Sequence, residues 1–80
     1  DAYFWATHNG AEIDLVLLMR GRRIGVELKR SDAPTLTPSM RIALNDLKLD
    51  ELHVVYPGER RYTLTKRVEV VPLAQAVNAE

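Results

Sequence analysis

Two runs of aliphatic and β-branched residues joined by a short connection constrain this chain more than any other feature. The runs are Glu12–Met19 and Arg22–Lys29, and Arg20-Gly21 lies between them. A glycine in a two-residue connection between two such runs indicates a β-hairpin. If Arg20-Gly21 is the loop, Met19 pairs with Arg22, and this pair fixes the register of the whole hairpin.

The register predicts one apolar and one charged face for the hairpin. Apolar pairs across two strands stabilise a buried sheet surface, so we expect the apolar face to pack on the core. That face pairs Ile13 with Leu28, Leu15 with Val26, and Leu17 with Ile24.

On the charged face, the register sets Asp14 opposite Glu27 and Glu12 opposite Lys29. Two carboxylates directly across a ladder repel each other and lower stability. A hard divalent ion, Mg²⁺ or Mn²⁺, would turn this repulsion into coordination by oxygen ligands. The alternative is a set of salt bridges without a function. Exposed pairs contribute little to stability, so this alternative explains the facing acids poorly.

At these residues the chain resembles the PD-(D/E)xK nuclease superfamily, whose signature is an acid on one strand and acid-x-Lys on the next. Asp14, a twelve-residue spacer and the run Glu27-Leu28-Lys29 match this pattern. The resemblance implies that Asp14 and Glu27 hold the metal and that Lys29 orients the attacking water and stabilises developing charge. Glu12 would assist as an outer ligand or base.

A second resemblance covers nearly the whole chain. It rests on the segments FWATHNGAEIDLVL, GRRIGVELKRSDAPTLTPSMRIALNDL, LHVVYPGERRYTL and VEVVPL. These resemble the uncharacterised domain at the C-terminus of predicted bacterial and archaeal AAA-superfamily P-loop ATPases, a family considered nuclease-like in fold. The resemblance implies that the chain is a fragment of a longer protein with an upstream ATPase domain as its partner. The sequence itself contains no glycine-rich phosphate loop.

Composition indicates one small soluble domain. The chain has 80 residues, of which 46% are hydrophobic and 28% charged. Cysteine is absent, which excludes disulfide and thiolate chemistry. The longest apolar run, Leu15–Met19, is too short to span a bilayer, so we expect a cytoplasmic protein that does not enter membranes.

Charge alone does not single out a nucleic-acid binder, because 11 basic and 11 acidic residues cancel. Two arginines are nevertheless candidate contacts to nucleic-acid phosphates. Arg30 directly follows the acid-x-Lys run, and Arg41 lies on a predicted helix. An exposed helix arginine is more often only solvated, and that interpretation of Arg41 stays open.

The remaining elements complete an α/β (α+β) fold with a mixed sheet. Thr37 is a predicted N-cap with Pro38 at the first helical position, and apolar residues follow at helical spacing. A strand at Leu52–Tyr56 then makes a right-handed βαβ unit with the hairpin. Short strands are expected at Arg61–Leu64 and Val68–Val71, and the second of them could add to the sheet edge. A helical turn is expected at Leu73–Ala79.

The predicted strand order is 1-2-3-4, with a first strand at residues 3–5. This is the β-β-β-α-β core of the restriction-endonuclease-like fold without its leading helix, which commonly carries another acid in active relatives.

Two functions follow from the resemblance. The first is Mg²⁺-dependent phosphodiester cleavage. The second is a catalytically inactive nuclease-fold module that binds nucleic acid or protein.

Overall fold

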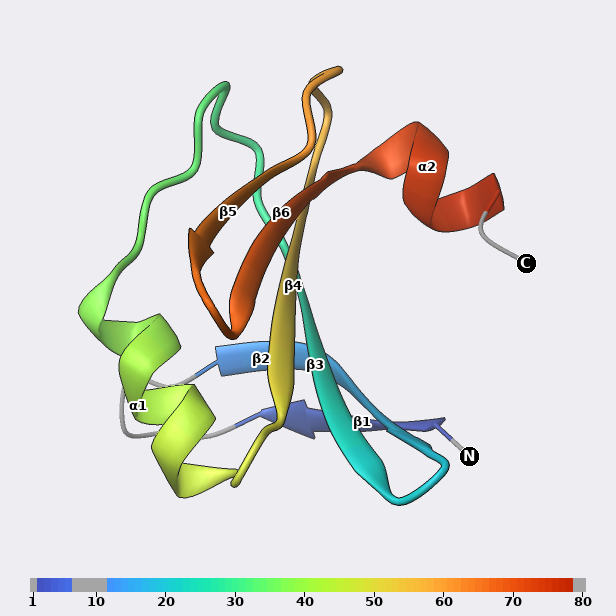
Figure 1. Ribbon diagram of the computed structural model, residues 1–80, viewed down its shortest axis with the longest axis vertical. Coiled ribbons are helices and arrows are strands. Elements are labelled where there is room, and N and C mark those ends of the chain that lie inside the picture. The colour runs from blue at the N-terminus through green and yellow to red at the C-terminus, as the bar shows by residue number, and fades with distance from the viewer. Residues whose placement is uncertain (1, 7–11, 79–80) are drawn as a thin grey trace.

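A six-stranded mixed sheet forms the body of the computed structural model, and α1 lies over one of its faces (Figure 1). The structure describes residues 2–6 and 12–78, and the side chains of residues 13–76. The elements in chain order are β1 (Ala2–Ala6), β2 (Glu12–Met19), β3 (Arg22–Leu28), α1 (Pro38–Asp46), β4 (Glu51–Tyr56), β5 (Tyr62–Thr65), β6 (Val68–Pro72) and α2 (Leu73–Asn78). Within these ranges, neither helix is long and apolar enough to cross a membrane.

The strand order is β1-β2-β3-β4-β6-β5. The first four strands follow the predicted order 1-2-3-4, but the sheet continues beyond β4. The strand expected as an addition to the edge, β6, lies next to β4, and β5 occupies the edge instead. β1, β2 and β3 are antiparallel neighbours, whereas β3 and β4 are parallel because α1 carries the chain across the sheet. β6 runs parallel to β4, and β5 forms the outer edge.

The hairpin of β2 and β3 turns at Arg20 and Gly21, whose φ angles of 54° and 79° are both positive. Positive φ at both central residues is the signature of a type I′ turn, which matches the twist of two antiparallel strands. The predicted register is confirmed from the pair Met19 and Arg22 to the pair Leu15 and Val26, where the backbone pairing of the two strands ends.

The prediction of which hairpin face packs on the core is wrong. Gly25 is buried opposite Val16, and a Cβ added to Gly25 would lie 2.6 Å from Leu49 Cδ1 and 3.2 Å from Leu52 Cδ1. The missing side chain thus makes room for two core leucines on this face. The other face is only partly covered, and its Leu28 is 60% exposed.

A bulge in β2 explains why Ile13 and Val16 are both buried, although they are an odd number of residues apart. Tyr3 pairs with Val16 and Trp5 with Ile13, so two residues of β2 lie opposite one residue of β1. An extra residue of this kind bends the strand and changes which side chains point inward. The bulge consists of Asp14 and Leu15, and it places Asp14 where β2 leaves β3.

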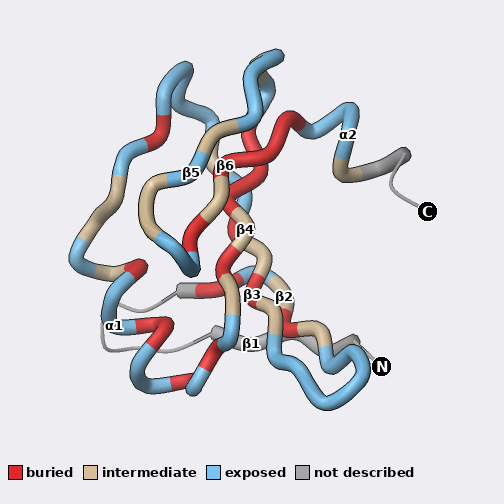
Figure 2. The backbone as a smooth tube through the Cα atoms, in the orientation of Figure 1, coloured by how far each residue is buried: buried red, intermediate tan, exposed pale blue. Residues whose placement is uncertain are grey.

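The helix α1 follows the sequence prediction closely. Its N-cap is Thr37, whose hydroxyl accepts a hydrogen bond from the Met40 N–H at 3.3 Å, and Pro38 is the first helical residue. Met40, Ala43 and Leu44 face the sheet and are buried. Figure 2 shows that the buried stretches concentrate along β4, β6 and the inner side of α1. The core therefore lies between α1 and the centre of the sheet.

Candidate functional site

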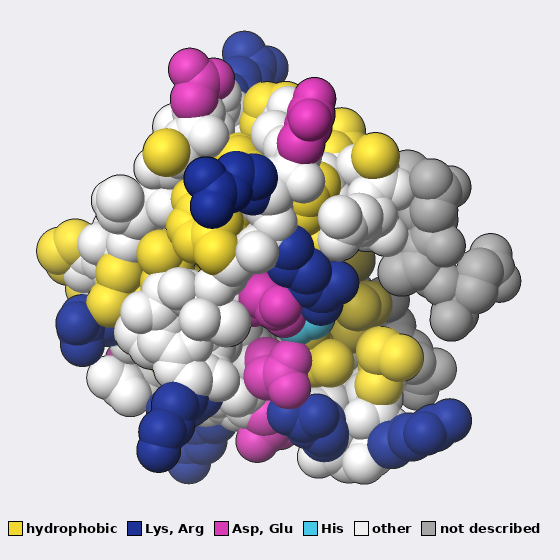
Figure 3. Space-filling model, turned by 45° about the horizontal axis from the view of Figure 1, so that its top comes forward, with side chains coloured by type: hydrophobic (Ala, Val, Ile, Leu, Met, Phe, Trp, Pro, Cys, Tyr) yellow, Lys and Arg dark blue, Asp and Glu magenta, His cyan; other side chains and the backbone are white. Residues whose placement is uncertain are grey.

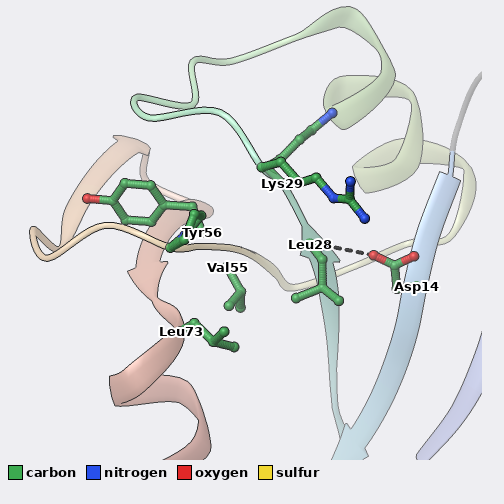
Figure 4. Close-up of a pocket in the computed structure, with 8 residues that line it drawn as sticks. Asp14, Leu28, Lys29, Val55, Tyr56 and Leu73 are labelled. Carbon is green, nitrogen blue, oxygen red and sulfur yellow. Dashed lines mark hydrogen bonds between the residues drawn. The ribbon is translucent and has the colours of Figure 1, made fainter.

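Asp14 lies at the point where β2 and β3 separate. Its Oδ2 accepts a hydrogen bond from the Leu28 N–H at 2.7 Å (Figure 4). The carboxylate thus takes the place of a backbone partner just beyond the last paired residues, Leu15 and Val26. The side chain is exposed, so its remaining acceptor capacity faces solvent.

Glu27 is buried on the opposite side of β3 from Leu28. It is 7% exposed and pairs with Val54, which pairs in turn with Val70, so its neighbours in this row of the sheet are fully buried apolar residues. Glu27 Oε2 lies 2.9 Å from Lys29 Nζ. Glu27 Oε1 is the one buried side-chain nitrogen or oxygen in the described part of the chain that has no hydrogen-bond partner. A buried carboxylate with one unpartnered oxygen lowers stability.

Lys29 connects the buried acid to the surface. Its backbone N–H donates to the Val55 carbonyl at 2.8 Å, which continues the pairing with β4 by one residue. Its side chain is 35% exposed while the ammonium group reaches Glu27. In Figure 4 the side chains of Lys29 and Leu28 point to opposite sides of β3.

A hollow of about 390 Å³ opens beside these residues, where the ends of β3 and β4 meet the start of α2. Asp14, Lys29 and Arg30 supply its charged lining. Its apolar wall includes Leu28, Val55 and Leu73, which converge in Figure 4. A charged rim around an apolar wall suits a ligand with an anionic group next to a less polar one.

The structure thus brings together three of the six residues predicted for the site, because Asp14, Lys29 and Arg30 line one hollow. Glu27 does not line this hollow and is joined to it only through its ion pair with Lys29. Arg41 lies elsewhere and lines a second hollow beside α1. Glu12 begins β2 and pairs with Ala6, but its side chain lies outside the described residues.

The direct cross-strand pair predicted for Asp14 and Glu27 lies beyond the end of the backbone pairing. Among the residues that the structure describes, no group of three or more His, Asp or Glu side chains is arranged to hold a metal ion. The metal assignment stays a prediction that rests on two acids.

Sequence reasoning missed the apolar wall of the hollow. Leu73 comes from the far end of the chain, and no local pattern links it to the acid-x-Lys run. Leu28 had a usable signal, because it lies between Glu27 and Lys29 in a strand and must point to the other side of the sheet.

A second cluster of charges lies on the face of the sheet away from α1, where acidic and basic side chains alternate around a histidine (Figure 3). Glu51 forms an ion pair with Arg22, and its Oε1 lies 2.9 Å from His53 Nε2. Hydrogen bonds from His53 and then Arg22 lower the pKa of Glu51. On β6, two hydrogen bonds from Arg61 lower the pKa of Glu69. Each of these carboxylates has its own cation.

Comparison with known proteins gives a family but no described activity. The family model described as a domain of unknown function (DUF4143) matches residues 1–76. The uncharacterized proteins Rv2008c of Mycobacterium tuberculosis and Mb2031c of Mycobacterium bovis are each 47% identical over 73 residues. The match covers 91% of this chain but only 17% of each relative's length. No solved structure matches the chain.

Proposed function

This chain belongs to the DUF4143 family of unknown function, and we propose that its Asp14, Glu27 and Lys29 form a metal-dependent site for phosphodiester cleavage. One observation carries the proposal. Glu27 is buried among apolar residues, yet its Oε1 has no partner. A carboxylate in this state lowers stability, so its presence indicates a role other than holding the fold together.

The oxygen atoms at this position suit Mg²⁺ or Mn²⁺. Both acids supply hard oxygen ligands, and these ions prefer such ligands. Mg²⁺ in particular is usually bound by one or two carboxylates, with water and substrate phosphate in the other positions. In this proposal Asp14 and Glu27 would supply the two carboxylates, and Glu12 would assist as an outer ligand or base. The bound ion would activate water and offset charge on the phosphate.

The other residues have separate tasks in this proposal. Lys29 holds Glu27 Oε2 at 2.9 Å, which leaves Oε1 available. The hydrogen bond from Leu28 fixes the orientation of Asp14. Arg30 lines the same hollow and carries a fork of donors that matches a phosphate group, so it would bind the substrate.

The topology supports the same proposal. The order β1-β2-β3-α1-β4, with a parallel crossover at its end, is the arrangement expected of the β-β-β-α-β nuclease-like core. We assign the chain to this restriction-endonuclease-like fold as part of the proposal. The chain spans only 17% of the length of its mycobacterial relatives. From the resemblance to ATPase C-terminal domains, we propose an upstream P-loop ATPase domain as a partner.

A catalytically inactive binding module is the second candidate function. It is favoured by the apolar wall of the hollow, where Leu28 is 60% and Leu73 46% exposed. Exposed apolar side chains next to charged ones are typical of a binding surface. In this case the hollow would bind nucleic acid or protein without cleavage.

A metal titration separates the two functions. We expect saturable amide shifts at Asp14, Glu27 and Leu28 when Mg²⁺ or Mn²⁺ is added, and their loss in Asp14→Asn. The asparagine oxygen still accepts the hydrogen bond from Leu28, so the fold is retained. The matched control is Asp32→Asn, an exposed acid in the loop before α1. Equal shifts in both variants, or none at millimolar ion, would contradict a metal site.

Cleavage itself is tested with labelled DNA and RNA oligonucleotides and Mn²⁺, on this chain and on a full-length relative. We expect Asp14→Asn to lower the cleavage rate about 100-fold or more, because the ion loses a charged ligand. Asp32→Asn leaves the rate unchanged. Metal binding without cleavage in the full-length protein would favour the binding module.

A further inference from the structure

A second hollow lies between α1 and the turn that joins β5 to β6, which are close to each other in Figure 1. Its volume is about 210 Å³. It is lined by Leu36, Arg41, Leu44, Asn45, Thr65 and Arg67. Two of these side chains are cationic and none is acidic. It shares no lining residue with the hollow beside Asp14.

The structure fixes Arg67 in place on one side of this hollow. Its guanidinium donates a hydrogen bond to the Leu49 carbonyl, and its backbone N–H donates to Thr65 Oγ1 at 3.1 Å. Its carbonyl accepts from the Leu52 N–H at 2.7 Å, which attaches the turn to β4. Because Thr65 accepts from Arg67, its own hydroxyl hydrogen is available to a ligand.

Arg41 and Asn45 form the other side. They are four residues apart on α1 and therefore lie on the same side of the helix. Arg41 is exposed, and its guanidinium has no hydrogen bond or ion pair with any residue that the structure describes. Arg22 and Arg61, by contrast, are paired with Glu51 and Glu69. The donors of Arg41 are thus free for a ligand.

We propose that this hollow binds a phosphate group. Guanidinium groups pair with phosphate through two parallel hydrogen bonds, and Arg41 and Arg67 present such groups from two separate elements. The Thr65 hydroxyl and the Asn45 amide add neutral donors. No carboxylate in the lining competes for the arginines. The phosphate belongs either to a nucleic-acid backbone or to a small phosphorylated ligand.

The test begins with inorganic phosphate added to the intact chain at low ionic strength, followed by backbone amide shifts. We expect saturable shifts at Asn45, Thr65 and Arg67. Arg41→Gln should weaken binding about tenfold or more, because a hydrogen bond to a charged group is lost. We expect this substitution to retain the fold, since the exposed Arg41 side chain forms no hydrogen bond or ion pair with a residue that the structure describes. Arg20→Gln, which removes an exposed arginine at the hairpin tip, is the matched control and should bind normally.

Two further ligands identify the source of the phosphate. A single-stranded oligonucleotide that binds more tightly than a mononucleotide, and more weakly to Arg41→Gln, would indicate a nucleic-acid backbone. Equal affinities would indicate a small phosphorylated ligand. Shifts that do not saturate, or that are the same in Arg41→Gln and Arg20→Gln, would overturn the phosphate site. Asp14→Asn should leave phosphate binding here unchanged, so failure of the metal site and failure of this site are distinguishable.

Discussion

On the face of the sheet away from α1, the acids are accompanied by cations: Glu51 binds Arg22 and His53, and Glu69 binds Arg61. On the face toward α1, Glu27 is surrounded by the apolar core and has only Lys29 for one of its two oxygens. Glu51 and Glu69 are partly exposed, and an ion pair at such a position contributes little to stability. Glu27 is buried, and a buried carboxylate that is incompletely paired lowers stability.

This difference separates Glu51 and Glu69, which form ordinary surface ion pairs, from Glu27, which core packing does not require. Paired charges on an exposed sheet face disfavour association through that face. An apolar residue of similar size would fill the Glu27 position with less penalty. Glu27 is therefore the acid whose presence needs a functional reason, and the next residue, Leu28, donates its backbone N–H to Asp14.

The largest effect is expected from Lys29→Met. It leaves both Glu27 oxygens without a partner and should lower the free energy of unfolding by about 3 kcal/mol, the low end for a broken buried pair because Lys29 is partly exposed. Urea unfolding measures the loss. Arg61→Met on the other face is the control and should cost less than about 1 kcal/mol. Equal losses of unfolding free energy in the two variants would mean that the ion pairs on the two faces contribute equally to stability.

Gly25→Val tests how tightly the core face is packed. The new side chain meets Leu49 and Leu52, so we expect a loss of about 2 kcal/mol in unfolding free energy. Val26→Thr, at the next residue and on the other face, should change it by less than about 0.5 kcal/mol. If Val26→Thr is the more harmful substitution, our assignment of the core face is wrong.

Glu27→Met asks directly whether the acid lowers stability. We expect unfolding free energy to rise by about 1 kcal/mol, because methionine fills the site next to Val54 without an unpartnered oxygen, and Lys29 turns to solvent. Thermal unfolding monitored by circular dichroism measures the gain. Glu69→Met, which only breaks an exposed ion pair, should not stabilise. A clear loss in Glu27→Met would show that the acid is structural after all.

The smallest effect is a pH dependence from the paired face. The pKa values of Glu51 and Glu69 are lowered from the ordinary 4.5, so the unfolded chain binds protons more readily than the folded one. The stabilisation from these pairs is thus complete above pH 4.5 and is lost as the pH falls through the lower folded values. We expect the free energy of unfolding to fall by less than about 1 kcal/mol as these pairs are protonated, and by still less in Glu51→Gln. An unchanged slope in that variant would contradict the assigned pairing.

Much of the fold was predictable because its signals are local. The Arg20-Gly21 turn fixed the hairpin register, and Thr37-Pro38 fixed the start of α1. The inward face of the hairpin was not predictable, because apolar residues occupy both faces of β2. The bulge at Asp14 and the space above Gly25 decided it, and both depend on elements that pack from elsewhere.

The candidate site was predictable in part. The spacing of Asp14 and Glu27-Leu28-Lys29 placed them on neighbouring strands, and Asp14 accepts a hydrogen bond from the Leu28 N–H. Their role as a metal site stays a prediction. Their direct opposition was not found, because the strands separate one residue earlier. Arg41 was expected to contact phosphate, but its partner Arg67 is distant in sequence and no pattern connected the two.

The amino-acid sequence by itself determined the strands, the helix and the meeting of an aspartate with the acid-x-Lys run. Turn chemistry, capping and periodicity act over a few residues and can be read directly. Only the tertiary structure decided that Glu27 is buried with an unpartnered oxygen and that Leu73 lines the hollow beside Asp14. Burial depends on the shapes of all the elements packed around a side chain, and those shapes exist only once the chain is folded.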